Sequence, residues 1–341
     1  MDTRGTWSAT ATRAGHCTGA ARLSSNIEVA MPLQLPIDLA ETRAVDHVPT
    51  GDDWSYEAKL DGWRGAVSSR GLWSRARRAL TSRFPEIVAA VAELGDAVLD
   101  GEIVAFRDTG RLDFSALQNS PQHRKQAGVT VYYVAFDLLA HHDVDLRPQP
   151  YHRRRDALNE LLSTSHQGLV QPVPATPERS EALTWLDPTW AAVGVEGVVA
   201  KPRNAAYLAG RRSGWRKTRT ITTTEAAVLG VTATSLVLGL PTRSGRWRPA
   251  GITQPLPHNL ATELTSRLHA SGSPTQLPGT VAGLPGQADD VWYQPTVIDT
   301  VVEIAVDGAF EFGRWRHRPQ LIRVRGDLVP DDLGAHARGE R

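Results

Sequence analysis

The chain has 341 residues, enough for one large domain with a substantial core and a smaller second domain. Hydrophobic residues make up 41% and charged residues 22%, as in ordinary globular proteins, and no apolar stretch is long enough to cross a membrane. The net charge of +1 by itself indicates no particular partner. The single cysteine, Cys17, excludes an intrachain disulfide and a cysteine-cluster zinc site, and fits a reducing cytoplasm.

The first thirty residues contain no apolar segment of the kind that a secretory signal needs. We interpret residues 1–30 as a disordered tail or an extension from an upstream start codon, with Met31 as an alternative start. Strand-like and helix-like stretches then alternate up to about residue 220. Several strands follow one another without a helix between them, which favours an α+β domain with antiparallel sheets. The expected strands are 54–60, 64–74, 96–106, 129–139 and 195–202, and the expected helices are 84–94, 151–163 and 180–193.

Residues 218–225, TRTITTTE, have the composition of a hinge. Strands are expected after it at 226–240, 301–310 and 320–326, with one helix at 259–270 and a loop rich in proline and glycine at 271–290. About five short strands with one helix are typical of a small barrel such as the OB-fold. We therefore predict a first domain over residues 31–220, an OB-fold domain over 221–335 and a short tail over 336–341.

Basic residues are clustered along the chain, although the net charge is small. Residues 201–220 hold seven basic side chains and no acidic one. Clusters of this kind, beside tryptophans, suit a phosphate backbone next to bases or sugars, although a solvated charged face is the alternative for any one of them. Only four of the 38 basic residues are lysines, at positions 59, 125, 201 and 217. Because arginine cannot become a neutral amine, the positions that keep lysine are candidates for a nucleophile.

The segment Glu57-Ala-Lys-Leu-Asp-Gly-Trp-Arg64 holds the strongest candidate. A lysine at a strand end, followed by a glycine turn, can present its amine at the mouth of a pocket, and Arg64 adds a cation nearby. To attack phosphorus the Lys59 amine must be neutral, which burial or neighbouring cations would favour. Taken alone, the pattern is more typical of a surface hairpin with an ordinary lysine.

Five further segments, taken together in their order along the chain, favour the interpretation of Lys59 as a nucleophile in a pocket. They supply carboxylates for a divalent metal, an aromatic ring for a base and cations for an α-phosphate. Each has a structural alternative, such as Phe136 in the core or Glu102 as a solvated strand end. Together with Lys59 they predict a nucleotidyl-transfer site. The segments are Ser74-Arg75, Asp100-Gly-Glu102, Tyr132-Tyr-Val-Ala-Phe-Asp137, Glu196-Gly-Val-Val-Ala-Lys201 and Trp215-Arg-Lys-Thr-Arg219.

This ordered set resembles the motifs of the covalent nucleotidyltransferases, which comprise ATP-dependent DNA ligases, RNA ligases and mRNA capping enzymes. The stretches LTSRFPEI, LDGEIVAF, RLDFSALQ, YYVAFDLL and EGVVAKPRNAAYLAGRRSGWRK are similar to bacterial ATP-dependent DNA ligases. The likeness is greatest to the stand-alone type C ligases of actinobacteria and to the ligase domain of end-joining proteins. It covers residues 33 to 331 and implies an ATP-grasp-like nucleotidyltransferase domain followed by the OB-fold.

The resemblance also implies a role for each matching residue. Lys59 would be the adenylated nucleophile, and Asp61 would orient its neighbours. Glu102 and Glu196 would bind the divalent metal, Mg²⁺ or Mn²⁺, with Glu102 also near the ribose. The 5′-phosphate side of nicked DNA would meet Arg75 and Arg219. The remaining ATP-binding positions would be Glu57 at adenine, Arg64 at ribose or phosphate, Phe136 stacked on adenine, and Lys201, Lys217 and Arg325 as cations.

Two positions depart from the family pattern. The second of two closing lysines is Arg219 here. The usual R-x-D-K near the C-terminus is Arg325-Gly-Asp-Leu328, with leucine in place of the lysine. A neighbouring Arg323 or Arg318 would have to take over the role of that lysine, or the transfer of AMP from ATP to the enzyme would be slow. The rival interpretations are an RNA ligase, a GTP-dependent capping-type enzyme and a non-catalytic nucleic-acid-binding protein. We expect a cytoplasmic monomeric enzyme of DNA repair that acts on nicked duplex DNA, with repair or end-joining proteins as partners and no membrane.

Overall fold

The structure is a computed structural model that describes residues 33–163, 168–265, 267–278, 291–308 and 310–336. The predicted tail over 1–30 and most of the proline- and glycine-rich loop over 271–290 lie outside the described residues, as do residues 337–341. Among the described helices none is both long and apolar enough to cross a membrane.

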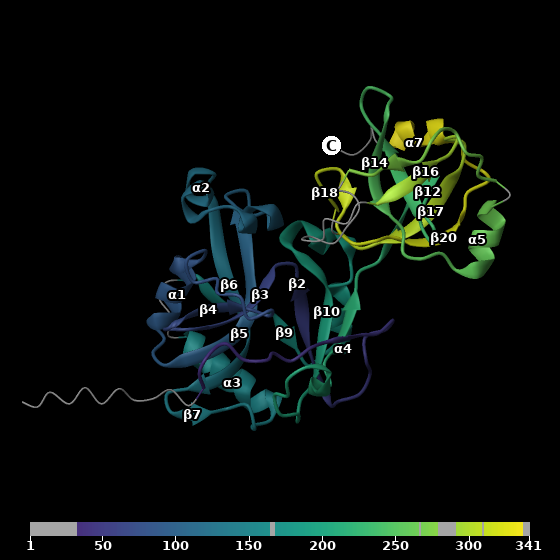
Figure 1. Ribbon diagram of the computed structural model, residues 1–341. Coiled ribbons are helices and arrows are strands. Elements are labelled where there is room, and N and C mark those ends of the chain that lie inside the picture. Colours follow the sequence, from purple (N-terminus) through teal and green to yellow (C-terminus); the bar gives the residue numbers. More distant parts are fainter. Residues whose placement is uncertain (1–32, 164–167, 266, 279–290, 309, 337–341) are drawn as a thin grey trace, which may run out of the picture. The chain divides into compact units, whose positions relative to one another are not determined.

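Two sheets form the first part of the chain (Figure 1). Neighbouring strands are antiparallel except for the β1–β11 and β6–β8 pairs. The five-stranded sheet has the order β1 (Arg43–Ala44), β11 (Arg216–Arg219), β10 (Val195–Pro202), β2 (Trp54–Leu60) and β9 (Ala175–Thr176). The six-stranded sheet has the order β4 (Gly71–Ser74), β3 (Trp63–Ser68), β5 (Ala97–Arg107), β6 (Val129–His141) and β7 (Val144–Asp145), and β8 (Val170–Pro172) pairs with β6.

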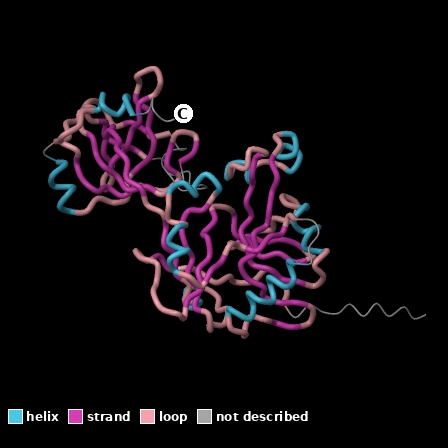
Figure 2. The backbone as a smooth tube through the Cα atoms, turned by 180° about the vertical axis from the view of Figure 1, so that it is seen from behind, coloured by secondary structure: helices cyan, strands magenta, loops and turns pink. Residues whose placement is uncertain are grey.

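Helices lie around the outside of these strands (Figure 2). One apolar core joins the six-stranded sheet to α1 and α3, and a second, which includes Tyr56, Val104 and Val198, joins the two sheets. A strand with apolar side chains on both faces, such as β5, is therefore buried on both sides. The helices are α1 (Pro85–Ala92), α2 (Pro121–Gln126), α3 (Tyr151–Ser163) and α4 (Arg179–Thr184), with 3₁₀ turns η1 (Phe114–Gln118), η2 (Pro188–Val193) and η3 (Arg211–Ser213).

The second part of the chain contains a seven-stranded sheet built around β12 (Thr222–Val231). Apolar residues of β12, β13, β14, β17 and β20 form its core with Leu264 and Trp315. The other strands of this sheet are β13 (Leu236–Pro241), β14 (Trp247–Ile252), β15 (Thr275–Gln276), β16 (Trp292–Pro295), β17 (Val301–Val306) and β20 (Gln320–Val324). A separate pair is formed by β18 (Phe310–Glu311) and β19 (Arg314–Trp315). The described helices of this part are α5 (His258–Thr265) and α7 (Pro330–His336).

Four sequence predictions need correction. The strand expected over 64–74 is the hairpin β3–β4, which turns at residues 69–70, and the strand expected over 226–240 is the hairpin β12–β13. The helix expected over 180–193 ends at Thr184, and η2 starts afresh at Pro188, because proline has no N–H for a continuing helix. The hinge predicted over 218–225 is mostly strand, with only Thr220 and Ile221 between β11 and β12.

Candidate active site

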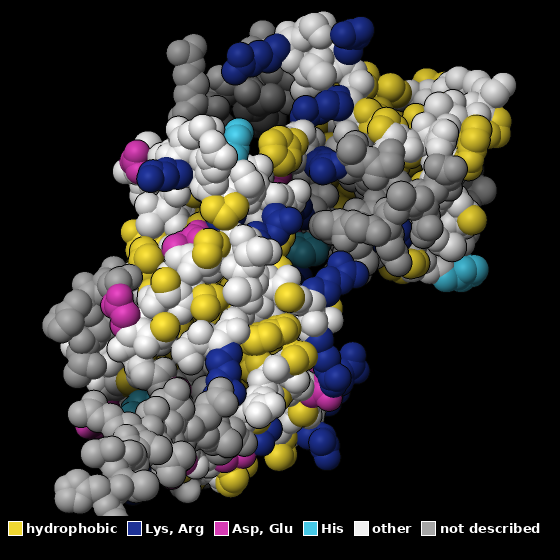
Figure 3. All heavy atoms as spheres, turned by 60° about the vertical axis from the view of Figure 1, so that its left-hand side comes forward, with side chains coloured by type: hydrophobic (Ala, Val, Ile, Leu, Met, Phe, Trp, Pro, Cys, Tyr) yellow, Lys and Arg dark blue, Asp and Glu magenta, His cyan; other side chains and the backbone are white. Residues whose placement is uncertain are grey.

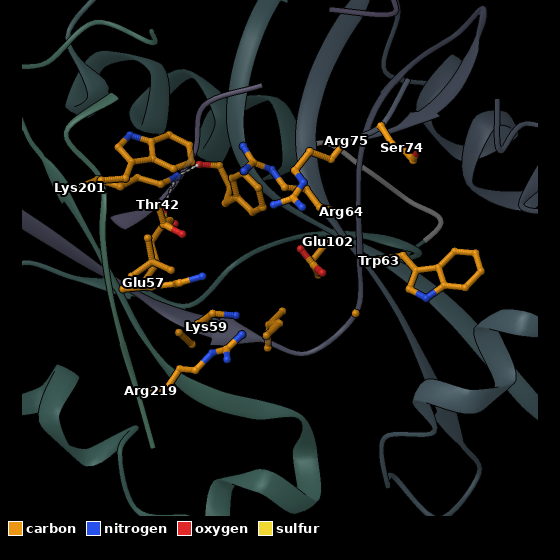
Figure 4. Close-up of a pocket in the computed structure, with 18 residues that line it drawn as sticks. Thr42, Glu57, Lys59, Trp63, Arg64, Ser74, Arg75, Glu102, Lys201 and Arg219 are labelled. Atoms are coloured by element: carbon orange, nitrogen blue, oxygen red, sulfur yellow. Dashed lines mark hydrogen bonds and ion pairs between the residues drawn. The ribbon is translucent and has the colours of Figure 1, made fainter. Parts of the chain in front are cut away.

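A cavity of about 640 Å³ opens between the two sheets of the first part of the chain. Its lining contains most of the residues that the sequence motifs singled out (Figure 4). They come from β2, β3, β5, β6, β10 and β11, so segments far apart in the sequence meet at one place. The predicted residues in the lining are Glu57, Lys59, Arg64, Arg75, Glu102, Phe136, Lys201, Lys217 and Arg219.

Lys59 is the penultimate residue of β2, and its amine forms an ion pair with Glu196 of the adjacent strand β10. Neither side chain is fully buried, at 17% and 11% exposed. The strand therefore presents the amine to the cavity, with a carboxylate beside it.

Two glycines of the motifs are required by close backbone contacts. A Cβ at Gly62, just after β2, would lie 2.2 Å from the carbonyl oxygen of Ile103. At Gly197, where φ is +148°, a Cβ would lie 2.1 Å from the carbonyl oxygen of Thr218. Because of these contacts, the end of β2 that carries Lys59 lies close to β5, and the start of β10 that carries Glu196 lies close to β11.

Glu102 faces Arg64 across the β3–β5 pair. Burial raises the pKa of Glu102 to about 8, against the opposing effects of Lys59 and Arg64. No three His, Cys, Asp or Glu side chains converge on a metal position within the described residues. Mg²⁺ prefers oxygen ligands, keeps several waters and needs only one or two carboxylates, so Glu102 and Glu196 fit it. Either carboxylate would bind as its ionised form.

Arg64 is held within the protein by several groups. Its guanidinium donates to both Asp100 oxygens, at 3.1 and 2.6 Å, and to the carbonyl of Ala40 at 2.5 Å. It also lies 5.1 Å from the Phe136 ring and 5.5 Å from the Trp215 ring. The structure thus places Arg64 in the cavity wall as a fixed cation rather than a mobile one.

Phe136 and Trp215 form an aromatic corner in the cavity, with ring centroids 6.0 Å apart and nearly perpendicular planes. Lys201 lies behind this corner and is only 1% exposed. Its amine is 4.0 Å from the Trp215 ring and donates to the Phe136 carbonyl at 2.9 Å. The exposed part of the corner is a flat apolar surface of the kind on which a purine base stacks.

Cations line the rest of the cavity. Burial, Arg219 and Lys59 lower the pKa of Lys217. Arg75 follows β4 and extends toward the cavity from the six-stranded sheet, whereas Arg219 lies beside Lys59 on the five-stranded sheet (Figure 4). Lys and Arg side chains also recur on the face drawn in Figure 3. An anionic ligand would meet positive charge from both sheets.

Arg325, the remaining predicted site residue, follows β20 in the second part of the chain. Its guanidinium donates to both oxygens of Asp327, at 2.9 and 2.8 Å, and to Glu225 at 2.6 Å. The cation therefore has carboxylate partners from its own part of the chain.

The structure adds residues that the sequence interpretation did not select. Thr42, Trp63, Ser74 and Trp215 line the cavity. Trp215 stands in a predicted motif, so its tryptophan was the available signal. Tyr151 is buried at the first position of α3, and its hydroxyl donates to Glu57 at 2.5 Å. No local pattern marks Tyr151, because its partner is 94 positions away.

Comparison with known proteins finds similar DNA ligases. The family described as "ATP dependent DNA ligase domain" matches residues 39–219. "DNA ligase C" of Mycobacterium tuberculosis (strain ATCC 25618 / H37Rv) is 31% identical over 339 residues, which cover 88% of this chain and 93% of that protein. "Multifunctional non-homologous end joining protein LigD" of Pseudomonas aeruginosa is 33% identical over 255 residues, 68% of this chain and 29% of that protein. A solved Lig E DNA ligase, titled as binding DNA with a minimal scaffold, matches 85% of this chain and 100% of its own with a TM-score of 0.52; at 17% identity this likeness concerns the fold alone.

Proposed function

Because the chain belongs to the ATP-dependent DNA ligase family, we propose that Lys59 takes AMP from ATP and that this AMP is used to seal 5′-phosphate/3′-hydroxyl nicks in duplex DNA, in DNA repair. The observation that supports this most directly is the position of Lys59. Its amine lies in a cavity with an aromatic corner on one side and cations from both sheets. The resemblance inferred from the motifs is confirmed at the level of the family.

The first step forms the lysine adduct. The neutral Lys59 amine attacks the α-phosphorus of ATP, the bond from that phosphorus to pyrophosphate breaks, and a phosphoramidate bond to AMP forms as the amine loses its proton. Lys217 stabilises the charge of the α-phosphate, and Arg219 is assigned to the DNA. Bound at Glu102 and Glu196, Mg²⁺ would neutralise phosphate charge. Adenine stacks on the Phe136 corner, next to Glu57.

The later steps reuse the same cations. An oxygen of the DNA 5′-phosphate attacks the AMP phosphorus and releases Lys59, which leaves an adenylated DNA end. The adjacent 3′-hydroxyl then attacks the 5′-phosphorus, AMP departs, and the nick is closed. Arg75 is assigned to the 5′-phosphate because it enters the cavity from the side opposite Lys59 (Figure 4). Positioning and charge neutralisation dominate chemistry of this type.

For the second part of the chain we propose an OB-fold that serves ATP in one step and DNA in the others. Its seven-stranded antiparallel sheet around β12 is compatible with a small barrel. Arg325 and Asp327 act chiefly in adenylation, with the Arg325 cation as the partner of the leaving pyrophosphate and Asp327 as the carboxylate that holds Arg325 before ATP binds. No finding favours an RNA ligase, a capping-type enzyme or a non-catalytic binding protein.

Labelling with α-phosphate-labelled ATP, followed by denaturing electrophoresis, tests the covalent step. Lys59→Arg should abolish the labelled adduct, because a guanidinium keeps its proton where a neutral amine is required. Lys125→Arg is the matched control, since Lys125 is an exposed lysine on α2 outside the motifs. Normal labelling of Lys59→Arg would refute the assignment.

The nucleotide and the metal are tested with the same assay. ATP with Mg²⁺ or Mn²⁺ should charge the enzyme, NAD should not, and the purified protein should contain no zinc. Sealing of nicked DNA supported by NAD alone would contradict this proposal, as would labelling by GTP in preference to ATP or sealing restricted to RNA.

A further inference from the structure

Glu57 is a buried carboxylate that uses only one of its two oxygens within the described residues. It is 2% exposed and lines the cavity from β2. Its Oε1 accepts a hydrogen bond from the Tyr151 hydroxyl at 2.5 Å and lies 2.9 Å from the Lys201 amine. Among the described residues no hydrogen bond reaches Oε2. Oε2 is not one of the fully buried side-chain atoms that lack a partner, so it is accessible from the cavity, where a donor group of a ligand can reach it.

Lys201 is committed to the protein interior. Besides Glu57, its amine contacts the Phe136 carbonyl at 2.9 Å and lies 3.9 Å from an Asp137 oxygen. The rings of Tyr151 and Trp215 are 4.9 and 4.0 Å away. With its donors directed to these groups, Lys201 neutralises Glu57 and holds it in place instead of extending to a phosphate.

Tyr151 fixes the same carboxylate from the other side. It is the first residue of α3 and is 1% exposed. Because α3 packs on β6 through Leu158 and Leu162, the position of the hydroxyl follows from the helix packing. Arg155, also on α3, lies 3.8 Å from the same oxygen. Glu57 thus has partners from α3 and β10 that all face Oε1, and no hydrogen bond within the described residues reaches Oε2.

We propose that Tyr151 is a positioning residue for base selection: together with Lys201 it holds Glu57 so that Oε2 accepts a hydrogen bond from the 6-amino group of a purine. This inference rests on the proposed function, in which adenine lies in this cavity. Guanine carries a carbonyl oxygen at the same ring position, and two acceptors facing each other leave a buried carboxylate oxygen unpaired. A fixed carboxylate therefore rejects guanine as well as binding adenine.

The test compares nucleotides that differ at this one group. Self-adenylation of the full chain is measured with ATP and with purine riboside 5′-triphosphate, which lacks the 6-amino group. The wild-type protein should prefer ATP. Tyr151→Phe should reduce that preference by about tenfold, mainly through a higher KM for ATP, because the unheld carboxylate no longer meets the amine in one geometry.

A double-mutant cycle separates positioning from general bracing. In a Glu57→Ala background, Tyr151→Phe should cause no further change in the nucleotide preference, because it acts only through Glu57. Glu57→Leu, which fills the space without an acceptor, replaces Glu57→Ala in the cycle if the alanine variant does not fold. Tyr132→Phe is the matched control: Tyr132 packs edge-on against Phe106, and its hydroxyl makes no hydrogen bond within the described part of the chain.

The outcomes distinguish this inference from the proposed function. If wild-type protein is labelled but Tyr151→Phe keeps the full preference for ATP, the positioning role is wrong and the proposed function stands. An equal effect of Tyr151→Phe with and without Glu57 would also overturn the role, since bracing alone would then explain it. If no nucleotide labels the wild-type protein, the proposed function fails and this inference fails with it.

Discussion

Two ion-pair groups, one in each part of the chain, each bind an arginine, and they differ in how far their carboxylates are exposed to solvent. Arg154 of α3 and Asp137 of β6 are fully buried, with two hydrogen bonds of 2.6 and 3.0 Å between them. Arg325 pairs with Asp327 at the surface, where 65% of the Asp327 side chain is exposed. A buried cation cannot change partner without a large desolvation cost, whereas an exposed one can exchange a carboxylate for a phosphate. The first group suits a permanent framework and the second a transient contact.

The buried group lies directly behind the base-selecting residues. Arg154 also donates to the carbonyls of Gln149 and Ala205, and Lys201 lies 3.9 Å from Asp137. Asp137 therefore compensates two cations that the proposed adenine site depends on. In the surface group the arrangement is reversed: one cation, Arg325, donates hydrogen bonds to two carboxylates, those of Asp327 and Glu225.

The largest expected effect is on the buried group. Asp137→Ala leaves Arg154 buried without its carboxylate and should lower the free energy of unfolding by about 3–5 kcal/mol. Denaturant unfolding measures it. The matched control is Asp145→Ala, which removes the partly exposed Asp145–Arg147 pair and should have a much smaller effect. The double variant Arg154→Met/Asp137→Leu should recover most of the loss. A similar loss in Asp137→Ala and Asp145→Ala would break the comparison.

The same contrast explains what the sequence could predict. Lys59, Glu102 and Lys217 stand in local patterns of strand, glycine and charge and line one cavity as expected, and Glu196 pairs with Lys59 at its edge. The strand at 195–202 has the predicted bounds because Val and Ala dominate it. Which oxygen of a carboxylate is occupied, by contrast, depends on packing between elements distant in sequence.

Two failures of prediction have that origin, and one site residue has contacts that no local pattern indicates. Arg64 lines the cavity as expected, but its hydrogen bonds to Asp100 and Ala40 depend on how β3, β5 and the segment before β1 pack. Tyr151 was not selected, because only the docking of α3 places it near Glu57. The hairpin turns at residues 69–70 and 232–235 contain no glycine, proline or asparagine, so each hairpin resembled one long strand.

A smaller and step-specific effect is expected at Arg325. Arg325→Ala should slow self-adenylation by about tenfold or more, because charge on the leaving pyrophosphate exists only in that step. Sealing of a pre-adenylated nick should survive much better, and the melting temperature should change little. Single-turnover rates for the two steps measure this. Arg248→Ala is the control, since Arg248 lies in the same part of the chain and donates to the carbonyl of Gly313 instead of to a carboxylate of this group. Equal losses in both steps would assign Arg325 to DNA binding or folding instead.

Leu328→Lys restores the commoner ending of the R-x-D-K motif. A lysine there would add a second cation near a departing pyrophosphate, so it should speed adenylation or leave it unchanged, by less than the Arg325 effect. Closure of a pre-adenylated nick should be unaffected, and the same pair of single-turnover rates checks it. A change in the closure rate alone would place position 328 at the DNA.

The smallest effect concerns the charge of Asp327. The hydrogen bond from Arg325 is the main reason that the pKa of Asp327 is lowered to about 2. A depressed pKa means that the pair stabilises the folded state above the ordinary aspartate pKa of about 4, and that this contribution disappears as the pH falls toward 2. Asp327→Asn should therefore melt slightly below wild type near neutral pH, and the melting temperatures of the two proteins should converge between about pH 4 and pH 2.

Salt at about 1 M should remove the same difference in melting temperature, because it screens exposed charges, while the loss of stability in Asp137→Ala should persist. A difference for Asp327→Asn that survives both acid and salt would mean that packing, not charge, holds this residue, and the surface pair would then resemble the buried one.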